Sequence, residues 1–162
     1  MVETLVGIFE NVPKEVAALI ISMLPIVELR GGIIASKLMA IPLSVAFPIC
    51  VFGNVLPMPV ILIFLNKIFA FLRRFSIFDK VLNFIDKKAE KNKEKVEKYK
   101  ALGLFLFVAI PLPGTGAWTG ALVANALNMP FKKSFPSIVC GVITAGVIMS
   151  VLSYFIPGLF GF

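Results

Sequence analysis

The chain has 162 residues, of which 59% are hydrophobic and 15% charged, with a mean hydropathy of +0.96. This apolar share is well above that of soluble globular domains, so the composition excludes that class and indicates an integral membrane protein. Three charge-free runs, residues 38–66, 101–131 and 134–162, each exceed the ~20 residues that a helix needs to cross a bilayer.

The first hydrophobic element, residues 16–24, is too short to span a membrane. It ends at Pro25 and at a turn that contains Gly31 and Gly32, and a second short apolar piece then extends to about residue 40. Two half-length helices around a turn predict a re-entrant hairpin over residues 14–41. Irregular backbone persists at membrane depth only where it is buried in protein or lines a watery cavity.

A segment long enough to span the membrane follows over residues 45–66 and completes a first unit, residues 14–66. Pro57 and Pro59 remove two backbone donors from it, so we expect a kink or break near Asn54.

The formal net charge of +7 is concentrated in a linker over residues 67–100, which holds 11 of the 16 Lys and Arg residues. Its first part, residues 68–85, has apolar side chains at helical spacing and predicts an amphipathic helix in the interface. The charged second part fits a solvated helical spacer or a partner-binding element. Basic residues beside membrane spans follow the positive-inside rule, so we place the linker in the cytoplasm, near membrane lipids, and expect no nucleic-acid partner.

The second half repeats the plan of the first. An apolar piece over residues 102–110 is interrupted by Pro111 and Pro113, and another apolar piece follows, which predicts a hairpin over residues 101–128. A span over residues 134–155 completes the second unit, residues 101–156.

Five helix-breaking residues recur at a constant offset of 88 positions between the two units. The pairs are Pro25 and Pro113, Gly32 and Gly120, Pro42 and Pro130, Pro48 and Pro136, and Gly53 and Gly141. Chance alignment of two common residue types is the alternative to a repeat. Counting membrane crossings gives the two units opposite orientations, with both termini outside. The predicted fold is therefore an all-α integral membrane protein with an inverted repeat of hairpin and span, in one membrane domain over residues 1–162.

Glu28 and Arg30 are the ionisable residues of the first hairpin turn. Charge at membrane depth costs about 2.5–3.5 kcal/mol per residue, which makes such residues functional candidates. Two positions apart in an extended turn, both could face one cavity, where Arg30 would bind a phosphate or carboxylate and Glu28 would couple ion movement. Alternatively, the two charges neutralise each other and hold the turn.

The facing turn carries no charge. Gly114 and Gly116 would let the backbone approach a ligand and leave free amides at the start of the next helix, which predicts an anion site. Thr115 would donate a hydroxyl group, and Trp118 would offer an amphipathic ring. Close packing of the two hairpin turns would require the same glycines.

Asn54 and Asn125 are polar residues in apolar surroundings, and they either line the same cavity or bond helix to helix. The chain has no histidine, nucleotide-binding loop or metal-ligand spacing, so neither an enzyme nor a metal or cofactor is expected.

Residues Glu28–Gly32 and Pro111–Gly120 resemble the putative small multi-drug export proteins of bacteria and archaea, over nearly the whole chain. That resemblance implies a distant relation to DedA-like (VTT-domain) proteins, which carry re-entrant hairpins in an inverted repeat. It also implies location in a prokaryotic cell membrane. DedA-like proteins are implicated in moving phosphate-bearing lipids, but they typically have more acidic and arginine residues in their hairpins than this chain.

The leading hypothesis is a secondary transporter or flippase for an anionic amphiphile, a phospholipid or polyprenyl phosphate, that works by alternating access. H⁺ or Na⁺ is the candidate coupling ion, and a homodimer is plausible because the helices enclose little volume. The alternatives are an exporter of small hydrophobic cations, with Glu28 as counter-charge, and a non-transporting scaffold that recruits a partner through its linker.

Overall fold

The computed structural model describes residues 12–64, 93–112 and 114–156, with side chains from residue 99 onward in the second range. These residues form six α-helices, a short π-helical turn and no strand, which confirms the all-helical class for this part of the chain. The helices are α2 (Lys14–Met23), α3 (Glu28–Leu38), α4 (Leu43–Val55), α7 (Lys93–Ala109), α8 (Ala117–Ala126) and α9 (Phe131–Ser150), which continues as η1 (Val151–Phe155). The amphipathic helix predicted over residues 68–85 lies outside the described residues.

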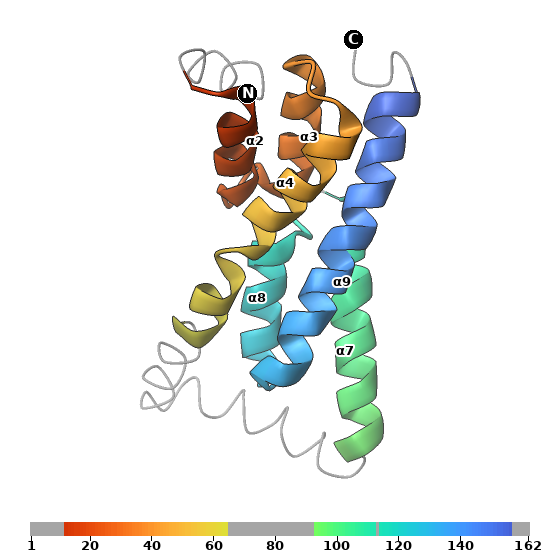
Figure 1. Ribbon diagram of the computed structural model, residues 1–162. Coiled ribbons are helices and arrows are strands. Elements are labelled where there is room, and N and C mark those ends of the chain that lie inside the picture. The colour runs from red at the N-terminus through yellow and green to blue at the C-terminus, as the bar shows by residue number, and fades with distance from the viewer. Residues whose placement is uncertain (1–11, 65–92, 113, 157–162) are drawn as a thin grey trace.

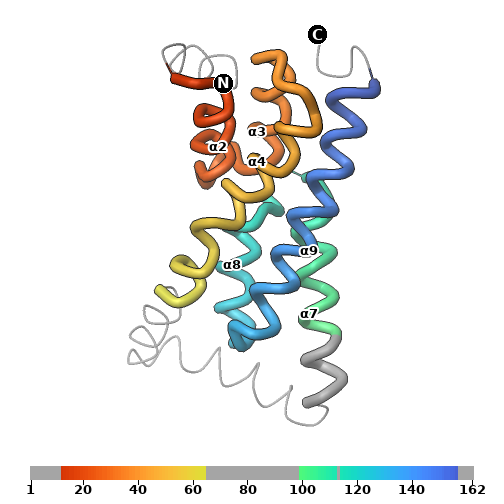
Figure 2. Tube along the Cα trace, viewed as in Figure 1, coloured from red at the N-terminus to blue at the C-terminus, as the bar shows by residue number. Residues whose placement is uncertain are grey.

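Two helix pairs approach each other from opposite ends of the molecule (Figure 1). Helices α2 and α3 form one pair and α7 and α8 the other, and the turn within each pair faces the middle. Helix α9 runs along both pairs and packs against α3, α4, α7 and α8. Helix α2 begins and η1 ends at the same end of the molecule, as the trace in Figure 2 shows.

Two helical segments are long and apolar enough to cross a membrane, Leu43–Phe64 and Phe131–Phe155, with 22 and 25 residues and mean hydropathies of 2.1 and 2.2. Only 28% of the most apolar window of the first and 44% of that of the second is buried inside the molecule. The core helix of a soluble protein would be mostly buried. These helices instead leave much of their apolar surface exposed, as a lipid-facing span would.

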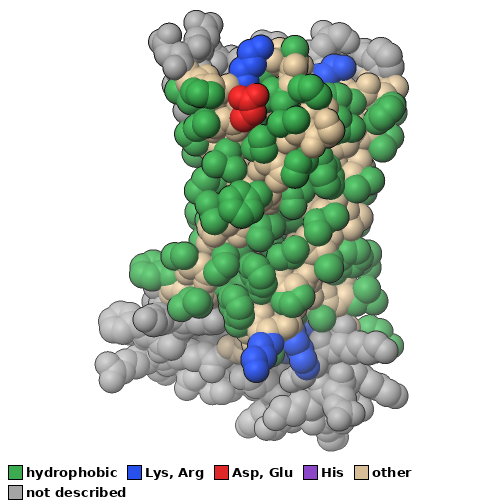
Figure 3. All heavy atoms as spheres, viewed as in Figure 1, with side chains coloured by type: hydrophobic (Ala, Val, Ile, Leu, Met, Phe, Trp, Pro, Cys, Tyr) green, Lys and Arg blue, Asp and Glu red, His purple; other side chains and the backbone are tan. Residues whose placement is uncertain are grey.

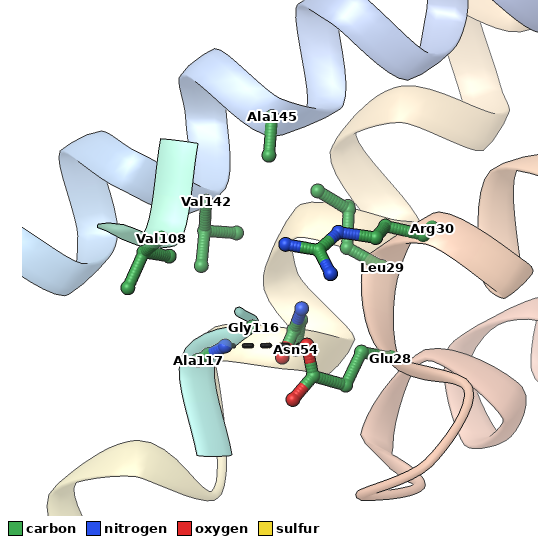
Figure 4. A pocket seen from close by; sticks show the side chains of 9 residues that line it. All are labelled: Glu28, Leu29, Arg30, Asn54, Val108, Gly116, Ala117, Val142 and Ala145. Carbon is green, nitrogen blue, oxygen red and sulfur yellow. Dashed lines mark hydrogen bonds between the residues drawn. The ribbon is translucent and has the colours of Figure 1, made fainter. Parts of the chain in front are cut away.

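The first of these segments is interrupted where the sequence predicts a kink. Helix α4 ends at Val55, Leu56 and Pro57 form a turn, and helix resumes over residues 58–64. Proline has no N–H to donate, so the ladder of helical hydrogen bonds is broken at this point. Asn54 lies in the last turn of α4, where it faces the helix-pair turns (Figure 4).

Helix α7 differs from the prediction because it crosses the expected boundary between linker and hairpin. Residues 93–100, assigned to the charged linker, form its first two turns, and the apolar part follows over Tyr99–Ala109. No glycine or proline separates the charged and apolar parts. Lys, Ala and Leu are all good helix formers, so one helix continues through both.

The second helices of the two pairs end in the same way. After α3, the N–H of Ile41 donates to the carbonyl of Ser36, and after α8 the N–H of Met129 donates to that of Ala124, both at 2.9 Å. Donors and acceptors are each 88 positions apart. The bond closes a left-handed C-terminal turn, and a proline follows it in both halves.

A lysine in the first helix of each pair bonds the end of the second helix of the same pair. Lys14 Nζ donates to the carbonyl of Met39 at 2.8 Å, and Lys100 Nζ donates to that of Leu127 at 3.0 Å. The lysines are 86 positions apart and the carbonyls 88, so the chain between the two bonded groups is longer by two residues in the second pair. A cation bonded to the last carbonyls of a helix also interacts favourably with the helix dipole.

Glycines let α4 and α9 approach the first helix of each pair. A Cβ at Gly53 would lie 2.7 Å from the carbonyl oxygen of Leu19 in α2. A Cβ at Gly141 would lie 3.0 Å from the carbonyl oxygen of Phe105 in α7 and 2.7 Å from Val108 Cβ. The contact of α4 with α2 therefore matches the contact of α9 with α7, and the two glycines are 88 positions apart.

The outer surface of the described helices is largely apolar. Large hydrophobic side chains are exposed on α4, on the helical residues 58–64, and on α7, α9 and η1, among them Phe52, Val60, Leu102, Val147 and Phe155. Figure 3 shows hydrophobic side chains over most of one face, with Lys and Arg near both ends. An apolar band between charged ends suits a protein surrounded by lipid.

Candidate functional site

The two turns meet through side chains at the start of α3. The prediction of an extended turn at Glu28–Gly32 was wrong, because these residues form the first turns of α3. Glu28 opens the helix with a φ of 52°, in the left-handed region that non-glycine residues rarely adopt. Glu28 and Arg30 nevertheless line the same cavities, as expected.

The Glu28 carboxylate lies against the start of α8. Its oxygens accept hydrogen bonds from the backbone N–H of Ala117 at 3.2 Å and of Trp118 at 3.1 Å (Figure 4 draws the first). Glu28 is only 7% exposed. A Cβ at Gly116 would overlap the Glu28 carboxyl group, so glycine provides the space that this group fills. An anion at a helix N-terminus satisfies free amides and interacts favourably with the dipole.

The Arg30 guanidinium binds carbonyl groups at a helix C-terminus, whereas Glu28 binds amides at a helix N-terminus. It donates to the carbonyl oxygens of Leu112, of Ile110 at 3.2 Å and of Thr115 at 3.0 Å, and to the hydroxyl of Thr115 at 3.0 Å. The Ile110 and Leu112 carbonyls follow the end of α7, where helical acceptors lack intrahelical partners. Arg30 therefore holds the turn of the second pair, and a fork of five donors suits several carbonyls at once.

Trp118 makes the reciprocal contact. Its indole N–H donates to the carbonyl of Met23, the last residue of α2, at 3.2 Å. Arg30 and Trp118 are 88 positions apart, and each donates to the end of the first helix in the opposite pair. The two pairs therefore complete each other's helix ends.

Two cavities adjoin this junction. The larger is about 450 Å³ and is lined by Pro25, Ile26, Val27, Glu28, Arg30, Gly114, Gly116 and Thr119. The smaller is about 10 Å³, roughly one water molecule, and its lining includes Glu28, Arg30, Asn54, Gly116 and Ala117 (Figure 4). A volume of several hundred Å³ is typical of small-molecule sites.

Asn54 and Asn125 differ in their placement. Asn54 is 1% exposed, lines the smaller cavity and leaves its Oδ1 without a hydrogen-bond partner among the described residues. Asn125 lies at the far end of α8, where its Nδ2 donates to the carbonyl of Ala121 at 2.9 Å, and it lines neither cavity. Of the two alternatives given for these residues, a shared cavity and a bond from helix to helix, the cavity holds for Asn54 alone, and the Nδ2 of Asn125 bonds within its own helix.

Of the other residues predicted for the site, some line a cavity and some do not. Pro25 and Gly114 line the larger cavity, and Gly114 has a φ of 83°, which favours glycine. Gly31 and Gly32 are buried in α3, and a Cβ at Gly32 would overlap Ser22 of α2. Pro111 lies in the second turn, and Pro113 lies outside the described residues.

Thr119 was missed although it lines the larger cavity. Its hydroxyl donates to the carbonyl of Gly116 at 3.2 Å. Its position in the first turn of α8, directly after Trp118, was the available signal. The amides that bind the carboxylate are those of Ala117 and Trp118, just after the predicted residues 114–116. Over the described part of the chain, no cluster of three His, Cys, Asp or Glu side chains could hold a metal ion.

The sequence model of one protein family, described as "putative small multi-drug export protein", matches residues 28–148. The match begins at Glu28 and includes α3, α4, α7, α8 and most of α9. No curated protein and no solved structure matches the chain. Since the matched residues make up more than half of the chain, the protein belongs to the family of putative small multi-drug export proteins, which together with its two long apolar helices makes it a membrane protein.

Proposed function

We propose that the protein is a secondary membrane transporter that moves an anionic amphiphile, a phospholipid or polyprenyl phosphate, between leaflets. In this proposal α2–α3 and α7–α8 are re-entrant hairpins of an inverted repeat. The lengths of α2, α3 and α8, which are 10, 11 and 10 residues, support it. At 1.5 Å per residue each helix covers about 15 Å, half of a hydrocarbon core of ~30 Å.

One observation carries the functional proposal: a cavity of about 450 Å³ borders a carboxylate and a guanidinium at the junction of the two pairs. Charged side chains at membrane depth generally mark ion or substrate pathways. Here they lie where two structurally similar units meet, which is where transporters built from repeats bind their substrates. The DedA-like relation implied by the motifs would add lipid-linked phosphates as the substrate class.

The contacts across the junction suit alternating access. Glu28, Arg30 and Trp118 bond one pair to the other through a few hydrogen bonds. The packing within each pair, by contrast, is held by glycine contacts and by the lysine at its open end. Rocking of one pair against the other would break these few hydrogen bonds, shift the packing of the pairs on α9 and open the cavity to either side.

Leaflet exchange of a fluorescent anionic phospholipid in proteoliposomes tests this function, with and without a pH gradient. We expect wild type to accelerate exchange in a gradient-dependent way and Glu28→Gln to abolish that dependence. Gly103→Ala is the matched control, because a Cβ there meets nothing within 4 Å. Exchange no faster than in protein-free vesicles, by protein shown to be folded, would exclude lipid transport.

Export of small hydrophobic cations is a second candidate, favoured by the family description and by the apolar side chains of Ile26 and Val27 beside Glu28 in the larger cavity. Under this alternative Glu28 is the counter-charge. Glu28→Gln should then abolish resistance to cationic drugs, whereas Arg30→Ala should have little effect or improve it. Loss of transport in both variants would favour the anionic amphiphile.

A further inference from the structure

The Glu28 carboxylate occupies the place where the sequence predicts an anionic ligand. It accepts the free amides of Ala117 and Trp118 at the start of α8, a helix of 10 residues. Gly116, the residue before those amides, lines both the smaller and the larger cavity. A group in the larger cavity would therefore need only to replace this carboxylate to reach the same amides.

Asn54 provides an independent indication that Glu28 has a second position. Asn54 Oδ1 is buried and has no hydrogen-bond partner in the described part of the chain, although such groups normally have one. Asn54 and Glu28 line the same small cavity. An amide oxygen can only accept a hydrogen bond. A carboxylate offers it no donor, whereas a protonated carboxyl group does.

We propose that the start of α8 is an exchange site at which the anionic headgroup of the transported amphiphile replaces the Glu28 carboxylate. Glu28 then takes a proton from water and donates it to Asn54 Oδ1. This inference rests on the proposed function, because it assumes an amphiphile as ligand. One anion and one proton enter together, so the net charge of the site does not change. The larger cavity, which Glu28 lines, is the route for both.

Glu28 is the group at this site whose protonation changes when the anion binds. Of the residues that α3, α4, α7, α8 and α9 contribute to the two cavities, only Glu28 and Arg30 are ionisable. The Arg30 guanidinium stays protonated and remains bonded to the carbonyls that follow α7. It therefore provides a constant positive charge beside the site, whichever anion occupies the amides.

Trp118 allows a direct test, because it is the only tryptophan of the chain and its backbone N–H donates to the Glu28 carboxylate. The full chain in neutral maltoside micelles is titrated with decanesulfonate, whose charge does not change with pH, while Trp118 emission is recorded. We expect a saturable change and an affinity that rises about tenfold for each unit of pH decrease, the signature of one proton taken up with the anion. Decyltrimethylammonium, a cation with the same tail, should give no saturable change.

Three variants sharpen the test. Glu28→Gln cannot titrate, so it should bind the sulfonate at every pH at least as tightly as wild type does at the lowest. Asn54→Leu removes the acceptor for the protonated side chain and should weaken binding about tenfold at each pH while keeping the slope. Gly103→Ala should behave as wild type. Binding independent of pH in wild type, or lost in folded Glu28→Gln, would overturn the exchange site.

The failure of this inference differs from the failure of the proposed function. Proton-linked sulfonate binding without accelerated lipid exchange in vesicles would keep the site and exclude lipid transport. Lipid exchange together with pH-independent sulfonate binding would keep transport and exclude the exchange of Glu28 for the anion.

Discussion

Glu28 and Gly116 occupy equivalent positions 88 residues apart, and the Glu28 carboxyl group fills the space that a side chain at Gly116 would need. The junction thus accommodates one carboxylate where the proposed repeat would offer two positions. An acidic residue in both halves would place two negative charges in one buried space, at a high cost in free energy. This explains why the second turn carries no charge while the first carries a pair.

Gly116→Ala should displace the Glu28 carboxylate from the amides of α8. We expect unfolding in detergent to require about 2–3 kcal/mol less than for wild type, because hydrogen bonds to a charged group are lost. Lipid exchange should fall at least tenfold. Gly103→Ala, in open space on α7, should lower neither, because alanine there makes no clash and favours the helix. Equal behaviour of the two alanine variants would contradict the placement of Glu28.

Arg30→Lys should destabilise the protein although the charge is kept. A lysine cannot reach the Ile110, Leu112 and Thr115 carbonyls together, as the guanidinium does. We expect a loss of about 1–3 kcal/mol, measured by thermal unfolding in micelles, with faster hydrogen exchange over residues 110–116. A lysine variant as stable as wild type would show that the fork of hydrogen bonds is unimportant.

Gly53→Ala and Gly141→Ala should have similar, strongly destabilising effects. In each case the new Cβ would meet a backbone carbonyl, of Leu19 or of Phe105, which cannot move aside as a flexible side chain can. Overpacking of this kind costs about 1–3 kcal/mol, measured as a lowered unfolding temperature. Tolerance of one substitution and not the other would contradict the equivalence of the two halves.

The proposed inverted topology predicts opposite accessibility for two lysines. In a background with Cys50→Ser and Cys140→Ser, Lys37→Cys should react with a membrane-impermeant maleimide added outside cells, and Lys132→Cys should not. Lys37 lies at the end of α3 and Lys132 at the start of α9, at opposite ends of the molecule (Figure 1). Labelling of both positions from one side would exclude the topology.

Prolines at helix boundaries made part of the helix pattern predictable from the sequence, whereas Pro48 and Pro136, also expected to break helices, lie inside α4 and α9. Proline lacks an N–H donor and restricts the conformation of the residue before it. Pro57 and Pro59 therefore predict the break after α4 without any knowledge of how the helices pack. The offset of 88 positions also anticipated the matched contacts at Gly53 and Gly141, because close helix approach requires the same small residue in both halves.

The partners of the site residues could not be read from the sequence in the same way. The pattern identified Glu28, Arg30 and an anion site in the facing turn. It predicted that an external ligand fills this site, whereas in the structure the carboxylate of Glu28 fills it. Which helix end meets which side chain depends on how the pairs dock. Asn125 was misplaced for the same reason, since nothing local indicates that α8 carries it away from the junction.

Each half of the chain completes the helix ends of the other, and this has a consequence for biosynthesis. Glu28 and Arg30 emerge from the ribosome long before Ala117, Trp118 and the carbonyls that follow α7. Until then the first half carries two charges with no partner in the second, and lipid would leave them unsatisfied. If the pairs are re-entrant as proposed, the first would gain a stable position within the bilayer only after the second has been synthesised, and membrane assembly of this chain would be a late and concerted event.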